Sequence, residues 1–190
     1  LAPTPYDAAA LRGIRAYGLA MVGRVAEAIA ELTEVLDWYA RSNLHFTRYQ
    51  FMLLLGEAHL RGGALESARK TAEEVLVASA EMGYRHLEAI ARRLLAESVL
   101  ALDPPAAERH LRDAVEAFRR SGARSHLARS LIAQAALCHM RGEEARAIAA
   151  LEEGLTIFRE IGTLDQSARV REALAMLDAG SAAAGHAYHH

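Results

Sequence analysis

Few residue types in this chain could do chemistry, and none of them falls into a catalytic motif. The sequence contains no GxxxxGK[ST] phosphate loop, no GxGxxG dinucleotide turn, no HExxH zinc site and no GxSxG nucleophile turn. The Gly62-Gly63 pair lies between two periodic apolar segments, which is typical of a turn between helices. We therefore predict neither an enzyme nor a bound cofactor.

The single cysteine and the histidines are the remaining candidates for nucleophilic or metal chemistry. Cys138 follows Ala135 by three residues on the packing side of a predicted helix, so we expect a buried, unreactive thiol. The internal histidines are scattered, and we expect the group at His186, His189 and His190 to bind metal only adventitiously. A lone cysteine forms no internal disulfide, which suits a cytoplasmic protein.

Two arginine pairs, Arg92-Arg93 and Arg119-Arg120, invite a nucleic-acid interpretation. Acidic residues are interspersed throughout, however, and the formal net charge is -2, whereas nucleic-acid-binding domains usually show a basic excess. Arg119 and Arg120 also fall in the last turn of a predicted helix, where cations complement the helix macrodipole. We predict no direct nucleic-acid binding. We also predict no membrane association, because no apolar run reaches the roughly 18 residues that a spanning helix needs.

The elements that carry these residues repeat along the chain. Similar segments begin at Ala28, Ala68, Ala107 and Ala147, at intervals of 40, 39 and 40 residues. Small or apolar residues follow each alanine at offsets of four, seven, eight and eleven, which is one face of an α-helix. The sixteen residues of this face are Leu32, Val35, Leu36, Tyr39, Ala72, Val75, Leu76, Ser79, Leu111, Ala114, Val115, Phe118, Leu151, Gly154, Leu155 and Phe158.

The ends of these segments are marked as clearly as their faces. Each closes on a residue that accepts the left-handed conformation beyond a helix end, namely Asn43, Gly83, Gly122 or Gly162. In the turn Asp103-Pro104-Pro105, a proline suits the first turn of the following helix, where its missing N–H is not needed. Another helix is predicted before each segment, at about residues 8–22, 44–61, 84–102 and 125–141.

The repeats define the expected domain organisation. We expect residues 1–5 to be a linker and residues 6–178 to form one helical-repeat domain. Its last amphipathic segment, 163–178, is predicted to cover the open end of the stack, because each repeat buries its face only against its neighbours. Residues 179–190 are predicted to be a disordered or added tail, and the absence of an initial methionine indicates a piece of a longer protein. The predicted repeats are 6–43, 44–83, 84–122 and 123–162.

Paired small residues in each repeat resemble the tetratricopeptide repeat (TPR) family, which places Gly or Ala at its eighth position and Ala at its twentieth. HEAT-like repeats share the long period, but the small pairs favour the TPR family. The resemblance implies an all-α, right-handed α-solenoid of about four antiparallel helix pairs plus a C-terminal capping helix. The pairs are Ala16/Ala28, Gly56/Ala68, Ala96/Ala107 and Ala135/Ala147.

The repeat length and closing phrases suggest a parent protein. The period of about 40 exceeds the standard period of about 34. Long repeats closing in phrases such as IFREIG resemble the TPR regions of bacterial LuxR-type (maltose-regulator-like) activators and the C-terminal regions of class III nucleotide cyclases. The resemblance implies a fragment of a bacterial signalling protein or transcriptional regulator. A composition with one lysine, Lys70, against many arginines also suggests a GC-rich bacterial genome.

In the TPR family the first helices of the repeats line a concave groove that holds a partner. The corresponding lining here mixes aliphatic and charged residues and lacks the lysines and asparagines of a chaperone-tail clamp, so a helix or extended peptide suits it better. The charged residues can equally pair with each other at i,i+4 spacing, as Glu57 with Arg61 and Arg93 with Glu97. The residues carried over are Tyr17, Gln50, Leu53, Glu57, Arg61, Ile90, Arg93, Glu97, Arg129, Ile132 and His139.

We therefore predict a protein-protein interaction and scaffolding module. Two alternatives stay open: a region that senses a small-molecule effector in the groove, and a homodimerisation domain. A deep, closed, polar pocket would favour the sensor, and an open groove would favour the interaction module. A symmetric apolar interface above about 1,000 Å² in total would favour the dimer.

Overall fold

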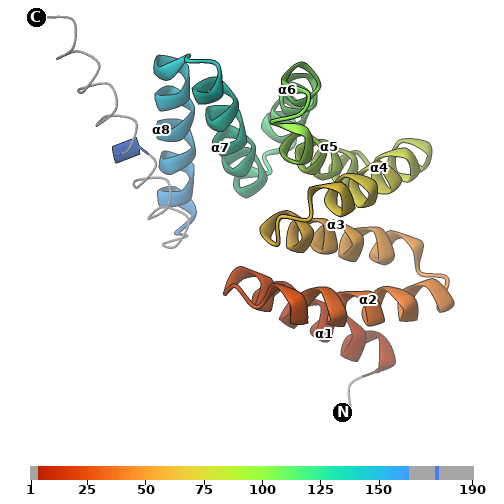
Figure 1. The fold of residues 1–190 in the computed structure, drawn as a ribbon. Helices are drawn as coiled ribbons and strands as arrows, with labels where there is room; N and C mark the ends of the chain where they lie inside the picture. Colours follow the sequence, from red (N-terminus) through yellow and green to blue (C-terminus); the bar gives the residue numbers. More distant parts are fainter. Residues whose placement is uncertain (1–3, 163–173, 176–190) are drawn as a thin grey trace, which may run out of the picture. The chain divides into compact units, whose positions relative to one another are not determined.

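The structure is a computed structural model that describes residues 4–162 and 174–175. Between residues 4 and 162 the chain forms eight α-helices and no strand, so the predicted all-α class is confirmed (Figure 1). Helix starts agree with the expected positions to within three residues, and α5 ends three residues earlier than predicted. The helices are α1 (Pro5–Met21), α2 (Val25–Arg41), α3 (His45–Arg61), α4 (Leu65–Met82), α5 (Arg85–Val99), α6 (Pro104–Ser121), α7 (Arg124–Met140) and α8 (Glu144–Ile161).

The helix ends follow the local signals in the sequence. The four predicted closing residues all have left-handed backbone, with φ of 56° at Asn43, 73° at Gly83, 70° at Gly122 and 78° at Gly162. Such angles cost glycine little and asparagine less than most other residues, which is why these types end the repeats. α6 begins at Pro104, as expected for a proline whose missing N–H would otherwise be unsatisfied in the first turn.

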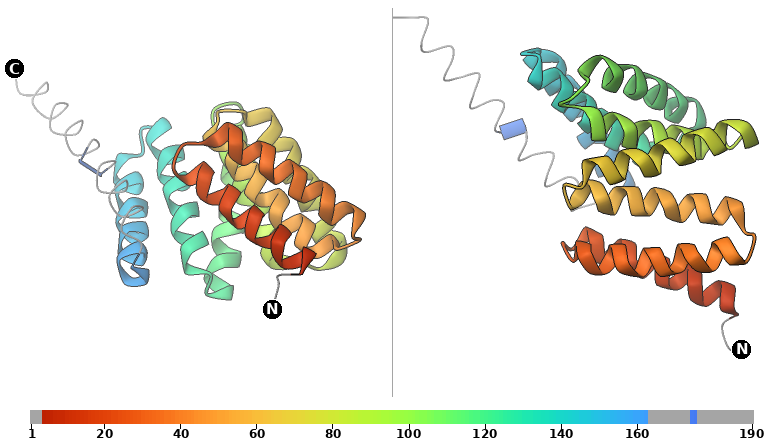
Figure 2. Two further views of the ribbon diagram at one scale, coloured as in Figure 1. Left: turned by 90° about the horizontal axis from the view of Figure 1, so that it is seen from below. Right: turned by 45° about the vertical axis from the view of Figure 1, so that its right-hand side comes forward.

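The chain divides into two compact units, Leu1–Asp103 and Pro104–His190. In the first unit, α1 pairs with α2 and α3 with α4, while α2 packs on α3 and α4 on α5. α3 also lies beside both α1 and α5, so these three helices form one layer, here called the inner layer (Figure 2). In the second unit, α7 packs against both α6 and α8.

The predicted periodic face forms the core. Fifteen of its sixteen residues are buried, and Leu76 is half-buried. In the first unit the Tyr39 ring on α2 stacks on Phe51 of α3, with centroids 5.2 Å apart. Phe51 in turn lies against Gly13 of α1, where a Cβ atom would overlap its ring. A small residue on one helix thus makes room for a ring on the next, which lets the helices approach closely.

Some expectations lie outside the part of the chain that the structure describes. The predicted capping segment 163–178 is described only at residues 174–175, and the tail 179–190 is not described at all.

At the N-terminal end of the described chain, α1 begins at Pro5. Thr4 caps this helix: its hydroxyl accepts a hydrogen bond from the Asp7 N–H, and its own N–H donates to the Asp7 carboxylate.

Candidate functional site

The residues predicted to line a groove all lie on the first helix of a helix pair. Eight of them belong to the inner layer of the first unit, and three belong to α7 in the second unit. The structure therefore brings the eight together on three adjacent helices. By helix they are Tyr17 on α1; Gln50, Leu53, Glu57 and Arg61 on α3; Ile90, Arg93 and Glu97 on α5; and Arg129, Ile132 and His139 on α7.

Their accessibility separates these residues into two groups. Leu53, Glu57, Ile90 and Arg93 are buried, so their side chains hold the helices together rather than face a partner. The remaining seven have side chains that a partner could reach. Gln50 and His139 are exposed, and Tyr17, Arg61, Glu97, Arg129 and Ile132 are half-buried.

Arg93 forms the centre of a buried ion cluster in the inner layer. It is 1% exposed, and its guanidinium donates hydrogen bonds to Glu97 one turn away on α5 and to Glu57 across the interface on α3. Burial alone would lower the pKa of Arg93, but the charges of Glu57 and Glu97 outweigh it and raise that pKa above its usual value. The predicted pairing of Arg93 with Glu97 is confirmed, and Glu57 is a further partner that spacing within one helix could not reveal.

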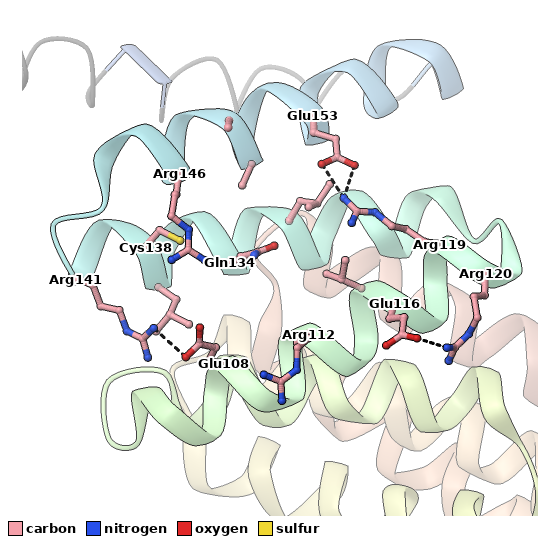
Figure 3. Close-up of a pocket in the computed structure, with 15 residues that line it drawn as sticks. Glu108, Arg112, Glu116, Arg119, Arg120, Gln134, Cys138, Arg141, Arg146 and Glu153 are labelled. Atoms are coloured by element: carbon pink, nitrogen blue, oxygen red, sulfur yellow. Dashed lines mark hydrogen bonds and ion pairs between the residues drawn. The ribbon is translucent and has the colours of Figure 1, made fainter.

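The second unit contains a cleft that the sequence did not predict (Figure 3). It has a volume of about 650 Å³ and opens between α6 and α8, with α7 as its floor. The floor is mostly apolar, whereas five arginines and three glutamates line the walls. The charged residues are Arg112, Arg119, Arg120, Arg141, Arg146, Glu108, Glu116 and Glu153; Val115, Leu131, Gln134, Leu137, Cys138, Ala149 and Ala150 complete the lining.

Ion pairs organise the walls of this cleft. Arg119 Nη2 on α6 donates to both carboxylate oxygens of Glu153 on α8, at 2.8 and 3.0 Å. Arg141 Nη1 donates to Glu108 Oε2 at 3.0 Å, and Arg120 pairs with Glu116 within α6. Arg119 and Arg120 do lie in the last helical turn, as predicted, but their side chains also line the cleft, which the macrodipole interpretation alone had missed.

Cys138 lies on the cleft floor. It is 4% exposed, and burial raises the pKa of its thiol, while the nearby charges of Arg146 and Arg141 act in the opposite direction. The prediction that this cysteine is buried is therefore confirmed. Burial and a raised pKa keep the thiol in its protonated form, which is the less nucleophilic one.

Two further observations, on metal-binding groups and on membrane-spanning helices, concern the part of the chain that the structure describes. No group of three or more His, Cys, Asp or Glu side chains in the described part of the chain could hold a metal ion. The histidines at 186, 189 and 190 lie outside that part. The described helices include none with the length and apolar character needed to cross a bilayer.

Comparison with known proteins places the chain in a fold class. It is an all-α, TPR-like protein of sequential antiparallel helix pairs. Among solved structures it is similar to the crystal structure of BtubC (BKLC) from P. vanneervenii, with 16% sequence identity and a TM-score of 0.50. That match covers 92% of this chain and 89% of the other, and it shows a shared fold. No protein-family model and no curated protein matches the sequence.

Proposed function

We propose that this chain is a protein-protein interaction module that holds a partner segment against the inner layer of the first unit. The observation that carries the proposal is the TPR-like fold, whose first helices α1, α3 and α5 lie side by side. Tyr17, Gln50, Arg61 and Glu97 offer an aromatic ring, an amide and charges of both signs on that layer, while Arg93 fixes the packing of α3 on α5.

The chemistry of these residues favours a mixed partner segment. Arg61 and Glu97 can each pair with a charge of opposite sign, and the Tyr17 ring can pack on an apolar side chain. A helix or extended peptide that carries both kinds of group would meet these requirements. The long repeats and their closing phrases support a place within a cytoplasmic bacterial signalling or transcriptional regulator.

A capture experiment with matched variants tests the proposal. The bait is the chain itself, either unchanged or carrying Tyr17→Ala, Gln50→Ala and Arg61→Ala together. The control bait carries Lys70→Ala, Val77→Ala and Glu81→Ala, three exposed positions on α4. Each bait is incubated with lysate of the source organism. We expect a specific protein to be retained by the unchanged and control baits and lost by the inner-layer variant. Equal retention by all three baits would show that the partner binds elsewhere.

Arg93 is left unchanged in these baits for a physical reason. Because its side chain is enclosed between Glu57 and Glu97, replacing it would disturb folding and partner binding together. The three replaced residues are accessible, and alanine preserves helix propensity at each position. A loss of binding by the inner-layer variant, with unchanged circular dichroism, would therefore report on the surface itself.

A further inference from the structure

We propose that the arginine-lined cleft of the second unit binds an acidic protein segment. In this arrangement carboxylates of the segment pair with Arg112 and its neighbouring arginines, while apolar side chains of the same segment rest on the cleft floor. The cleft is formed by α6, α7, α8 and Arg141 in the turn between α7 and α8, so this second binding surface does not depend on the proposed function of the inner layer.

An internal comparison shows that helix packing does not require these arginines. α2, α3 and α4 of the first unit pack in the same order as α6, α7 and α8, and their residues occupy the same repeat positions 79 residues earlier. Only one of the five equivalent positions is an arginine. The equivalents of Arg112, Arg119, Arg120, Arg141 and Arg146 are Thr33, Ala40, Arg41, Gly62 and Ser67.

Arg112 is the cleft arginine that is least engaged within the protein. Its side chain is 66% exposed and forms a long ion pair with Asp113, in which Nε lies 4.0 Å from the carboxylate, beyond hydrogen-bond distance. Glu108 and Glu116 flank it at i,i+4 spacing, but Glu108 bonds with Arg141 and Glu116 with Arg120 (Figure 3). Arg112 therefore offers a planar guanidinium that a carboxylate from outside can engage through two hydrogen bonds.

The remaining charges limit the cleft to a ligand that carries few negative charges. Arg146 pairs with Glu143, just outside the lining, and Arg119 with Glu153 across the cleft. The lining itself holds five arginines against three glutamates, an excess of two positive charges. Counting Asp113 and Glu143 at the rim balances this excess. We therefore expect attraction for a few well-placed carboxylates rather than for a dense polyanion.

The apolar floor selects a peptide over other anions. Ala149 is exposed in the cleft, and Leu131, Leu137 and Ala150 lie beneath it with little exposed area. A phosphate or a sugar-phosphate backbone would leave this apolar part of the lining unused, and the wall glutamates would repel closely spaced phosphates. The wall from Glu108 to Arg120 spans twelve helical steps, about 18 Å at 1.5 Å per residue. A partner helix of about three turns, with acidic and apolar residues on one face, matches that length.

A fluorescence anisotropy titration of the full chain tests this proposal. The probe is a fluorescein-labelled peptide of about twelve residues, built from alternating pairs of glutamate and leucine and blocked at both ends. A second peptide carries glutamine in place of every glutamate. We expect the acidic peptide to bind about tenfold or more tightly than the neutral one, the loss of a charge-assisted bond being roughly that large. Binding should weaken between about 50 and 200 mM salt.

Matched arginine variants locate the binding. Arg112→Glu should weaken binding of the acidic peptide about tenfold or more, and Arg112→Gln should weaken it less. Arg109→Glu makes the same charge change on an exposed residue of the same helix that does not line the cleft, and it should change affinity by less than about threefold. Circular dichroism of each variant, with the intermediate Arg112→Gln, separates loss of binding from loss of folding.

Several results would overturn the proposal. One is the absence of saturable binding to the unchanged protein even at low salt. Another is binding of the neutral peptide as tightly as the acidic one. Equal losses of peptide affinity from Arg109→Glu and Arg112→Glu would indicate that binding depends on the general electrostatic potential of the surface rather than on the cleft. Displacement of the peptide by a short single-stranded DNA at lower concentration would assign the cleft to nucleic acid. None of these outcomes bears on the inner-layer variants, so the two proposals fail separately.

Discussion

Replacement of Arg93 provides the sharpest test of how the inner layer is held together. Arg93→Met keeps most of the volume of the side chain but removes the cation that both Glu57 and Glu97 contact. Glu57 is 8% exposed and cannot turn to water without opening the interface between α3 and α5. The variant therefore removes the cation that offsets a buried carboxylate, which is the costly way to break a buried ion pair.

The size of the effect follows from the exposure of the two carboxylates. Breaking a buried pair costs about 3–5 kcal/mol. The side chain of Glu97 is 32% exposed and recovers part of its hydration, so its share is small and the lower end, about 3 kcal/mol, is expected. Adding Glu57→Met to Arg93→Met removes the stranded charge and should restore most of that loss, because an apolar replacement of a buried pair is often nearly neutral.

Urea unfolding followed by tryptophan fluorescence measures this loss of stability in the first unit, which contains Arg93. Trp38 is the only tryptophan of the sequence. It lies on α2, in the same unit as the Arg93 cluster on α3 and α5. A loss of about 3 kcal/mol corresponds to a fall of roughly 1–3 M in the urea midpoint. As a control, Arg85→Met replaces an exposed arginine on α5, the helix that carries Arg93. It should change stability by about 0.5 kcal/mol or less.

Two results would refute this reasoning. An unchanged urea midpoint for Arg93→Met would mean that Glu57 finds compensation elsewhere and that the cluster adds nothing. A double variant, Glu57→Met with Arg93→Met, that is less stable than Arg93→Met alone would mean that loss of packing, rather than a stranded charge, explains the change. The double-mutant cycle separates these terms because each single variant removes one partner.

Two further predictions concern glycines and a histidine of the first unit. Gly13→Ala should lower stability by about 1–3 kcal/mol because its Cβ would overlap the Phe51 ring, whereas Gly18→Ala on the same helix meets no atom within 4 Å and should raise it by about 0.5–1 kcal/mol, both measured by urea unfolding. Burial lowers the pKa of His59, so the native state binds its proton less readily than the unfolded state. Its contribution to stability is present above about pH 6.5 and is lost as the pH falls through the native pKa. His59→Gln should flatten that part of the pH-stability profile, and an unchanged profile would exclude His59 as its cause.

Local signals explain why the fold could be predicted from the sequence. The spacing of Leu32, Val35 and Tyr39 defines a buried helical face whatever lies against it, and Asn43 ends the helix through its own backbone preference. Such information is contained within one or two turns of chain. Repetition at intervals of about 40 residues then confirms each helix several times over, which a single periodic segment could not do.

The charged clusters could not be predicted in the same way because their partners are distant in sequence. Glu57 and Arg93 are 36 residues apart, and Arg119 and Glu153 are 34 apart. Each pair joins corresponding helices of consecutive repeats, a little less than one period apart. A search for opposite charges at that spacing would have found both pairs. Spacing within a single helix predicts only pairs such as Arg93 with Glu97.

Burial distinguishes two arginines that the sequence presents alike. Arg93 has Glu97 at i,i+4 spacing, and Arg112 has Glu108 and Glu116, so such pairing is expected for both. In the structure Arg93 is enclosed and engages two carboxylates, whereas the glutamates beside Arg112 bond with other arginines. The first arginine therefore stabilises the packing of α3 on α5. The second has a guanidinium available for a ligand, and this difference in engagement is why the proposed cleft site centres on Arg112.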